Sequence, residues 1–228
     1  TIKDNTSHGD IKIGEECGNG GGIQCGNGSL VMVNSTISGN QGGVRGRARG
    51  GGLMVGCACK AVLINSTVSG NEASREGGRT YRSGDSLGGG IFVYGELHLI
   101  HSTISGNQST VTGRARGGGI HVGCSCQALI VNSTISNNSA ARKSGSEYKG
   151  GHSQGGGIFV AGNLQLIHTT ITGNHANGAG GGVYVAKHLD YINSLITGNT
   201  GKRGNCVMGG ARQDGSLPTI GVNLYNFV

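Results

Sequence analysis

The stretch that decides the fold begins at Gly88 and ends at Asn107, and it reads Gly-Gly-Gly-Ile-Phe-Val-Tyr-Gly-Glu-Leu-His-Leu-Ile-His-Ser-Thr-Ile-Ser-Gly-Asn. Its apolar residues alternate in short runs that glycine or polar residues separate, which is typical of β-strands and not of helices. We predict three short strands, over residues 91–93, 97–100 and 102–105. The side chains expected to point inward are those of Ile91, Val93, Leu97, Leu99 and Ile104.

The same pattern recurs along nearly the whole chain. Glycine clusters precede six aliphatic residues, and an Asn/His-Ser-Thr-Ile-Ser-Gly-Asn type of motif closes each repeat; the six are Ile23, Leu53, Ile91, Ile120, Ile158 and Val183. Strands this short need neighbours, and coils stacked ~4.8 Å apart bury one continuous aliphatic column. The sequence therefore predicts an all-β fold, a right-handed parallel β-helix (solenoid) of about six to seven coils with three short strands per coil.

The repeats also define the boundaries of the solenoid. We predict the six-coil helix over residues 23–199, a strand-like segment over 1–22 that is a partner coil or an assembly arm, and a terminal coil or assembly segment over 200–228. Asn40 to Asn107 and Asn71 to Asn138 are both spaced by 67 residues, so two adjacent coils form a duplicated unit. All length variation falls at one corner, so the inserted loops are expected to project from a single edge.

Two corners of each coil carry a recurring polar residue. Side-chain amides at equivalent positions of stacked coils can hydrogen-bond from coil to coil, which predicts structural ladders. The predicted ladder at the first corner is Asn34, Asn65, His101, Asn132, His168 and Asn193, and the one at the second corner is Asn40, Asn71, Asn107, Asn138, Asn174 and Asn199.

The chain has 228 residues with 49 Gly, one Pro and no Trp, and no apolar run approaches the ~18 residues of a membrane span.

The content of seven cysteines points to an oxidising compartment. The odd number of cysteines leaves at least one thiol free or paired with another chain. We expect each Cys-X-Cys pair to lie in an exposed turn as a disulfide, within its own turn or to another cysteine, with a soft metal as the alternative. The candidates are Cys17, Cys25, Cys57, Cys59, Cys124, Cys126 and Cys206.

Basic residues gather in the inserted loops of a chain with net charge +7. They favour contact with acidic polysaccharide, an anionic cell surface or the backbone of DNA, without sequence-specific recognition of nucleic acid; a solvated loop face is the alternative. This basic edge consists of Arg45, Arg47, Arg49, Arg75, Arg79, Arg82, Arg114, Arg116, Arg142, Lys143 and Lys149. The accessible N-glycosylation candidates are Asn5, Asn107 and Asn137.

Catalytic chemistry finds little support in the sequence. The 11 Asp and Glu form no paired arrangement that would bind calcium or supply an acid and a base on one face, so we expect no catalytic residue, cofactor or metal. We expect His98, His121 and His188 to face outward. The third strand presents an outward hydroxyl array that resembles ice-binding solenoids, at Thr36/Ser38, Thr67/Ser69, Thr103/Ser105, Thr134/Ser136 and Thr170/Thr172.

The Gly-Gly-Gly-Ile and Asn-Ser-Thr-Ile-Ser-Gly-Asn signatures resemble those of bacterial right-handed parallel β-helix surface proteins, including polymorphic outer-membrane-protein passengers. The segment from Asn193 to Leu224 looks like the end of secreted repeat proteins of the choice-of-anchor type. The resemblance implies the fold and an extracellular or cell-surface location. The expected function is a non-enzymatic structural or adhesive subunit that stacks head-to-tail on itself into a filament. The alternatives are a fragment of an adhesin passenger that binds anionic glycans, and, from another class, a polysaccharide-active enzyme or an ice-binding protein.

Overall fold

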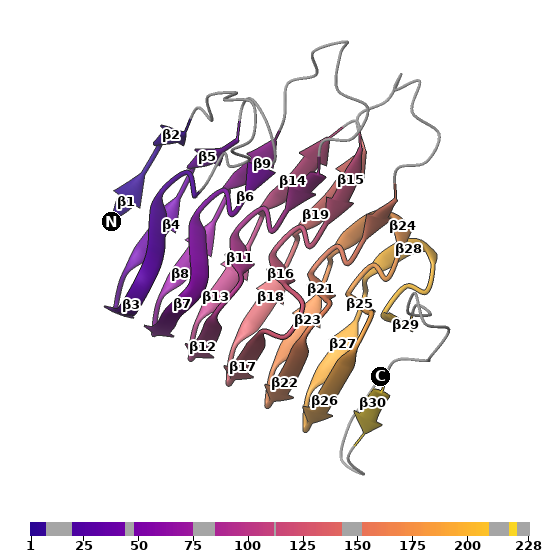
Figure 1. The fold of residues 1–228 in the computed structure, drawn as a ribbon. Helices are drawn as coiled ribbons and strands as arrows, with labels where there is room; N and C mark the ends of the chain where they lie inside the picture. The colour runs from indigo at the N-terminus through magenta and orange to yellow at the C-terminus, as the bar shows by residue number, and fades with distance from the viewer. Residues whose placement is uncertain are drawn as a thin grey trace.

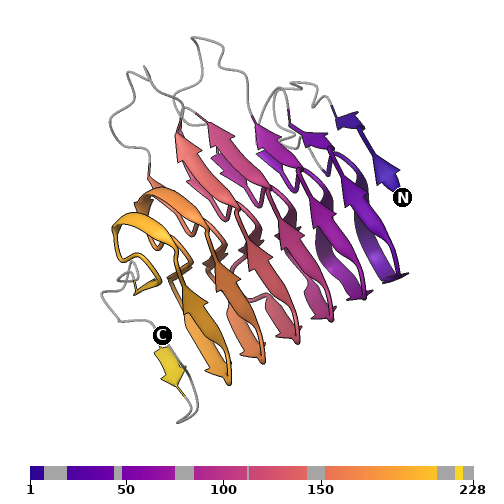
Figure 2. The same cartoon turned by 180° about the vertical axis from the view of Figure 1, so that it is seen from behind.

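The computed structural model describes residues 1–7, 20–43, 48–74, 85–111, 113–142, 152–209 and 219–222. Within these ranges every regular element is a β-strand, and strands of neighbouring coils pair in parallel. The coils stack in one column, and Figure 1 and the reverse view in Figure 2 show the same progression from the N-terminal to the C-terminal end. The predicted fold class, a parallel β-helix, is confirmed.

The strands form three sheets that run along the solenoid. The seven-stranded sheet contains β1 (Ile2–Lys3), β4 (Thr36–Ser38), β8 (Thr67–Ser69), β13 (Thr103–Ser105), β18 (Thr134–Ser136), β23 (Thr170–Thr172) and β27 (Leu195–Thr197). The twelve-stranded sheet contains β3 (Ile23–Val33), β7 (Leu53–Ile64), β11 (Ile91–Val93), β12 (Glu96–Ile100), β16 (Ile120–Val122), β17 (Gln127–Val131), β21 (Ile158–Val160), β22 (Asn163–Ile167), β25 (Val183–Val185), β26 (His188–Ile192), β29 (Val207–Gly209) and β30 (Thr219–Val222).

The third sheet carries the inserted loops. It contains β2 (Thr6–Ser7), β5 (Gln41–Gly42), β6 (Ala48–Arg49), β9 (Glu72–Ser74), β10 (Asp85–Leu87), β14 (Gln108–Val111), β15 (Arg114–Arg116), β19 (Ser139–Arg142), β20 (Ser153–Gln154), β24 (His175–Ala179) and β28 (Thr200–Arg203). Each coil therefore has more strands than the three we expected. The stems on both sides of a loop also pair with the coils above and below, because a backbone at the coil spacing satisfies its hydrogen bonds in this way.

The core lies inside the column of coils. The five side chains predicted to point inward, those of Ile91, Val93, Leu97, Leu99 and Ile104, are all 0 % exposed. Each lies in register with an aliphatic residue of the next coil, as Ile91 does with Ile120. Because a coil alone exposes its apolar edge above and below, the stack supplies the burial that stabilises each rung.

The glycine clusters mark a corner where the backbones of adjacent coils approach closely. A Cβ built on Gly89 would lie 2.3 Å from the carbonyl oxygens of both Gln108 and Gly118, so no other residue fits there. The preceding Gly88 has a φ of 64°, a conformation that is cheap for glycine alone. The corner therefore requires glycine for both space and backbone conformation.

At the second corner the asparagines form a continuous hydrogen-bonded ladder. The side chains of Asn40, Asn71, Asn107, Asn138, Asn174 and Asn199 are 0–4 % exposed. Nδ2 of Asn71 donates to Oδ1 of Asn107 at 3.0 Å, and Nδ2 of Asn107 donates to Oδ1 of Asn138 at 2.9 Å. The same Oδ1 atoms also accept from the backbone N–H of the preceding coil, at 3.0 Å for Asn71 and Asn107. Each amide is thus satisfied by the coils on either side.

The first corner differs from the prediction in part: Nδ2 of Asn65 donates to Oδ1 of Asn34 at 2.6 Å, but all six polar side chains are exposed. Asn34, Asn65, His101, Asn132, His168 and Asn193 share a φ between 47° and 50°. Asparagine is favoured at this corner because it tolerates the left-handed backbone conformation better than most residues do. Hydroxyls of the following residues make the buried contacts between coils, as when the backbone N–H of Ser66 donates to Oγ of Ser102 at 3.1 Å.

Both end segments pair with the solenoid itself. In the N-terminal segment, β1 and β2 pair with β4 and β5, and Nδ2 of Asn5 donates to Oδ1 of Asn40 at 2.9 Å. In the C-terminal segment, β28, β29 and β30 pair with β24, β25 and β26. The described parts of both segments therefore add strands to their own chain.

The ladder predicts a strong effect of Asn107→Ala on stability. The variant removes four hydrogen bonds and leaves buried partners unsatisfied, so we expect a loss of about 3 kcal/mol in the free energy of unfolding. Asn132→Gly at the exposed corner is the control, since glycine accepts the positive φ, and it should change stability by under ~1 kcal/mol. Urea denaturation measures both, and equal losses would contradict the role of the ladder.

Candidate functional site

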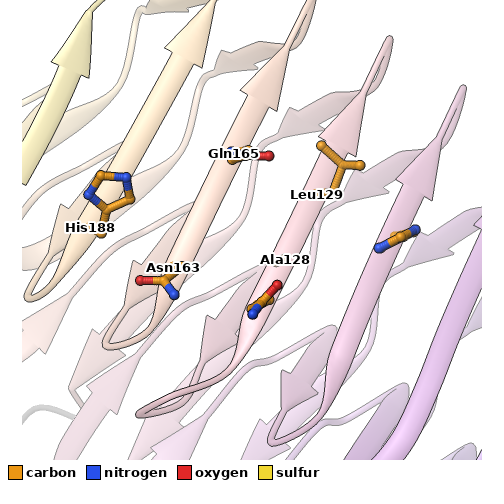
Figure 3. Close-up of a pocket in the computed structure, with 7 residues that line it drawn as sticks. Ala128, Leu129, Asn163, Gln165 and His188 are labelled. Carbon is orange, nitrogen blue, oxygen red and sulfur yellow. The ribbon is translucent and has the colours of Figure 1, made fainter.

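A shallow depression lies on the outer face of β12, β17, β22 and β26. Strand alternation turns one set of side chains toward the core and the other set outward. The depression has a volume of about 540 Å³ and is lined by His98, Gln127, Ala128, Leu129, Asn163, Gln165 and His188. Figure 3 shows Asn163 and Gln165 on β22, between His188 of β26 on one side and Leu129 of β17 on the other. We call the residues His98, Gln127, Leu129, Asn163, Gln165 and His188 the amide face.

A column of aliphatic side chains runs beside the amide face. Its members are in register from coil to coil and point outward at the end of each strand: Val33, Ile64, Ile100, Val131, Ile167 and Ile192. Val33 is 51 % exposed and the others are half-buried. We did not anticipate this aliphatic column from the sequence, although the alternation that buries Leu97 and Leu99 already places Ile100 on the outside.

The charged and titratable side chains near the amide face contact one another. Nζ of Lys60 and Nε2 of His98 lie 2.9 and 2.7 Å from Oε1 of Glu96, and Nε2 of His188 lies 2.8 Å from Oδ2 of Asp190. The hydrogen bond from Lys60 lowers the pKa of the Glu96 carboxyl. The face therefore presents amides, beside acidic groups that already have partners within the protein.

The two carboxylates beside the amide face are too far apart for glycoside hydrolysis. Glu96 is in register with Gln127, which pairs with Asn163, which in turn pairs with His188, so Glu96 and Asp190 are separated by three coil steps. Three steps correspond to ~14 Å, whereas the paired carboxylates of glycosidases lie within ~9.5 Å of each other. These two groups cannot act on the same glycosidic bond.

An aromatic column fills the outer side of the glycine corner, and His121 belongs to it. The prediction that His121 faces solvent is wrong, because the side chain is only 5 % exposed. Its ring stacks on Phe92 at a centroid distance of 5.2 Å and on Phe159 at 4.9 Å, and Phe159 stacks on Tyr184 at 5.4 Å. Burial, followed by the positive charge of Arg116, lowers the pKa of His121 to about 3. The imidazole is neutral at physiological pH.

Two arginines of the predicted basic edge cover this aromatic column. The guanidinium carbon of Arg49 lies 5.6 Å from the ring centre of Phe92, and that of Arg116 lies 5.0 Å from the ring centre of Phe159. Arg49 is 8 % exposed, and burial lowers the pKa of Arg116. These contacts are cation–π interactions, so Arg49 and Arg116 are packing groups and not accessible charges of the basic edge that we predicted.

The rest of the predicted basic edge is described only in part. Arg114 is exposed in β15. Arg142 belongs to β19, but its side chain lies outside the described residues, as do Arg45, Arg47, Arg75, Arg79, Arg82, Lys143 and Lys149. A basic edge built on these residues stays a prediction.

One disulfide joins the first two coils. It links Cys25 of β3 to Cys59 of β7, with the two Cα atoms 6.0 Å apart. The predicted disulfide of the second Cys-X-Cys pair is not formed: Cys124 is an exposed thiol, and burial raises the pKa of Cys126 to about 11.

The other described cysteines outside the second Cys-X-Cys pair form no disulfide. Cys57 is an exposed thiol and Cys206 a half-buried one, while Cys17 lies outside the described residues. Among the residues that the structure describes, no three His, Cys, Asp or Glu side chains gather as they would around a metal ion.

The glycosylation candidates differ in access. Asn107 cannot be modified in the folded chain, because it is 0 % exposed and its Nδ2 donates within the ladder. Asn5 is exposed, but its Nδ2 donates to Oδ1 of Asn40 and to the carbonyl of Lys3. Asn137 is exposed with a φ of 55°. Modification of Asn5 and Asn137 stays a prediction.

The fold and its repeated outer columns define a parallel β-helix repeat protein. Residues 168–186 match the Chlamydia polymorphic membrane protein (Chlamydia_PMP) repeat. These residues run from His168 at the first corner of one coil, through β23 and β24, to β25 of the next coil. The match supports a surface repeat protein with an extracellular or cell-surface location. No curated protein and no solved structure matches the chain. Over the described ranges, helices of membrane-spanning length and hydropathy are absent.

The buried imidazole predicts a pH dependence of stability. Because the pKa of His121 is about 3 in the folded chain and 6.5 as the ordinary value, the unfolded chain takes up a proton first as the pH falls. The contribution of the neutral His121 to stability is therefore fully present above pH ~6.5. It is lost as the pH falls from 6.5 toward the folded-state pKa of about 3, by up to about 1.4 kcal/mol per pH unit.

His121→Phe isolates this effect, because phenylalanine continues the stack and does not titrate. Denaturant unfolding at pH 7 and pH 5 should show a smaller loss for the variant than for the native chain, with the carboxylates common to both. An identical loss in the two proteins would show that His121 is protonated in the folded state.

Proposed function

We propose that the chain is the surface-exposed solenoid of an adhesin-like protein and that it binds uncharged glycans through the amide face. The observation that carries this proposal is the set of amide and imidazole groups of Gln127, Asn163, Gln165, His98 and His188 in one shallow depression. The match of residues 168–186 to a surface-protein repeat supports the exposed location.

The chemistry of the amide face complements that of a sugar. A side-chain amide both donates and accepts hydrogen bonds, as a sugar hydroxyl does. Leu129 and the aliphatic column beside it offer apolar area to the C–H faces of a pyranose ring. Since the groups stand on paired strands, little backbone conformational entropy is lost when a ligand binds.

Charge pairing favours uncharged sugars over acidic ones at this face. Lys60 and His98 are already paired with Glu96, and His188 is paired with Asp190. An anionic glycan would have to compete with these carboxylates. Binding of anionic glycans by the basic edge, and head-to-tail stacking of the chain into a filament, stay predictions from the sequence.

The double variant Asn163→Ala/Gln165→Ala tests the proposal. Loss of two hydrogen-bonding groups should weaken binding by about five- to 150-fold, since each hydrogen bond contributes about 0.5–1.5 kcal/mol. The probe is an array of uncharged oligosaccharides, followed by calorimetry with the best binder.

Thr103→Tyr on the seven-stranded sheet is the matched control and should bind the same sugar as the native chain does. The proposal fails if the native chain binds no uncharged oligosaccharide, or if the double variant binds with unchanged affinity.

A further inference from the structure

From β4 to β23 the outer face of the seven-stranded sheet is a regular lattice of hydroxyl groups; in the end strands, Leu195 of β27 and Lys3 of β1 stand at the positions that pair with Thr170 and Ser38. Pairing without register shifts aligns one column of Thr36, Thr67, Thr103, Thr134 and Thr170, and a second column of Ser38, Ser69, Ser105, Ser136, Thr172 and Thr197. The residue between the two columns points inward and is 0–1 % exposed in every coil from Ile37 to Ile196. The lattice is therefore backed by a rigid aliphatic layer.

The dimensions of the lattice follow from strand geometry. Neighbouring strands lie ~4.8 Å apart, and residues two positions apart along a strand are separated by ~6.7 Å. Each of the five strands from β4 to β23 thus adds two hydroxyls at fixed positions. Both repeats are close to the spacings between oxygen atoms on the prism faces of hexagonal ice.

The hydroxyls are free to face an external ligand. In the described part of the chain, no hydrogen bond joins the side-chain oxygens of these two columns to another protein group, whereas Ser66 and Ser102 at the adjacent corner bond to the backbone. The residues of the two columns from β4 to β23 are half-buried and uncharged. The threonine column also presents a methyl group in each of these five coils.

The duplicated unit shows that the fold does not impose this uniformity. At equivalent positions of the two copies, four outward residues of the twelve-stranded sheet all differ: Lys60/Gln127, Val62/Leu129, Glu96/Asn163 and His98/Gln165. On the seven-stranded sheet, Thr67/Ser69 recur as Thr134/Ser136, and Thr103/Ser105 recur as Thr170/Thr172. The four polar or mixed positions of the twelve-stranded sheet have thus changed, although its aliphatic column recurs as Ile64/Val131 and Ile100/Ile167, while the four positions of the seven-stranded sheet have all kept a hydroxyl.

We propose that this hydroxyl face binds ice. A ligand that is periodic in two dimensions can bind the same chemical group at every lattice point. A soluble sugar or peptide is instead recognised by a few different groups, as on the amide face. Alternating methyl and hydroxyl groups hold a layer of ordered water that becomes part of the ice crystal. The rigidity of the sheet keeps the hydroxyl lattice aligned with the ice lattice over several coils. This activity goes beyond glycan binding and does not depend on it.

The test is the behaviour of the native chain at a growing ice surface. We expect thermal hysteresis and incorporation of the fluorescently labelled chain into a slowly grown ice hemisphere. In the variant Thr103→Tyr, a side chain protruding from the centre of the lattice should reduce the hysteresis at least about tenfold, with an unchanged urea midpoint because position 103 points outward.

Two further variants separate the ice-binding face from the rest of the molecule. Asn163→Ala/Gln165→Ala alters the amide face alone and should retain full hysteresis. Thr134→Lys places a charge in the same threonine column and should abolish incorporation, so the test holds even if Thr103→Tyr fails to fold. Exclusion of the native chain from ice, or full activity in both threonine variants, would overturn the proposal, and neither result bears on glycan binding.

Discussion

The whole architecture depends on the hydrogen bonds between buried asparagine side chains of successive coils. Each amide, such as that of Asn107, accepts from the coil before it and donates to the coil after it. This arrangement has one register, because a slip of one residue would turn every inward side chain outward. The outer residues therefore form straight columns, and each face of the molecule is a chemical pattern repeated at the spacing of the coils.

The sequence alone was sufficient for the fold, because glycine clusters and alternating aliphatic residues have few structural solutions. It was insufficient at the first corner, where asparagine serves two different needs. An inward amide and a left-handed backbone both favour Asn, and the structure shows that Asn34 and Asn132 meet the second need. The histidines His101 and His168 at the same corner were the available sign that a buried ladder was absent.

The environment of a residue on the outer side was harder to predict than its orientation. Alternation correctly places His121 on the opposite side from Ile120, but it does not reveal that the glycine corner brings Phe92, Phe159 and Arg116 around the imidazole. In the same way, counting charges along the loops treats Arg49 as solvated, although it lies on an aromatic ring. Contacts between coils decide both cases, and the linear sequence does not display them.

The covalent bond between Cys25 and Cys59 gives the solenoid a mechanical polarity. It joins the coil of β3 to the coil of β7, where the outward side chains of Val31 and Val33 are 64 % and 51 % exposed. Under tension, the rungs of a stack separate first where only non-covalent contacts join them. The coils on either side of this pair should thus separate first, and the two coils that the disulfide joins should stay together longest.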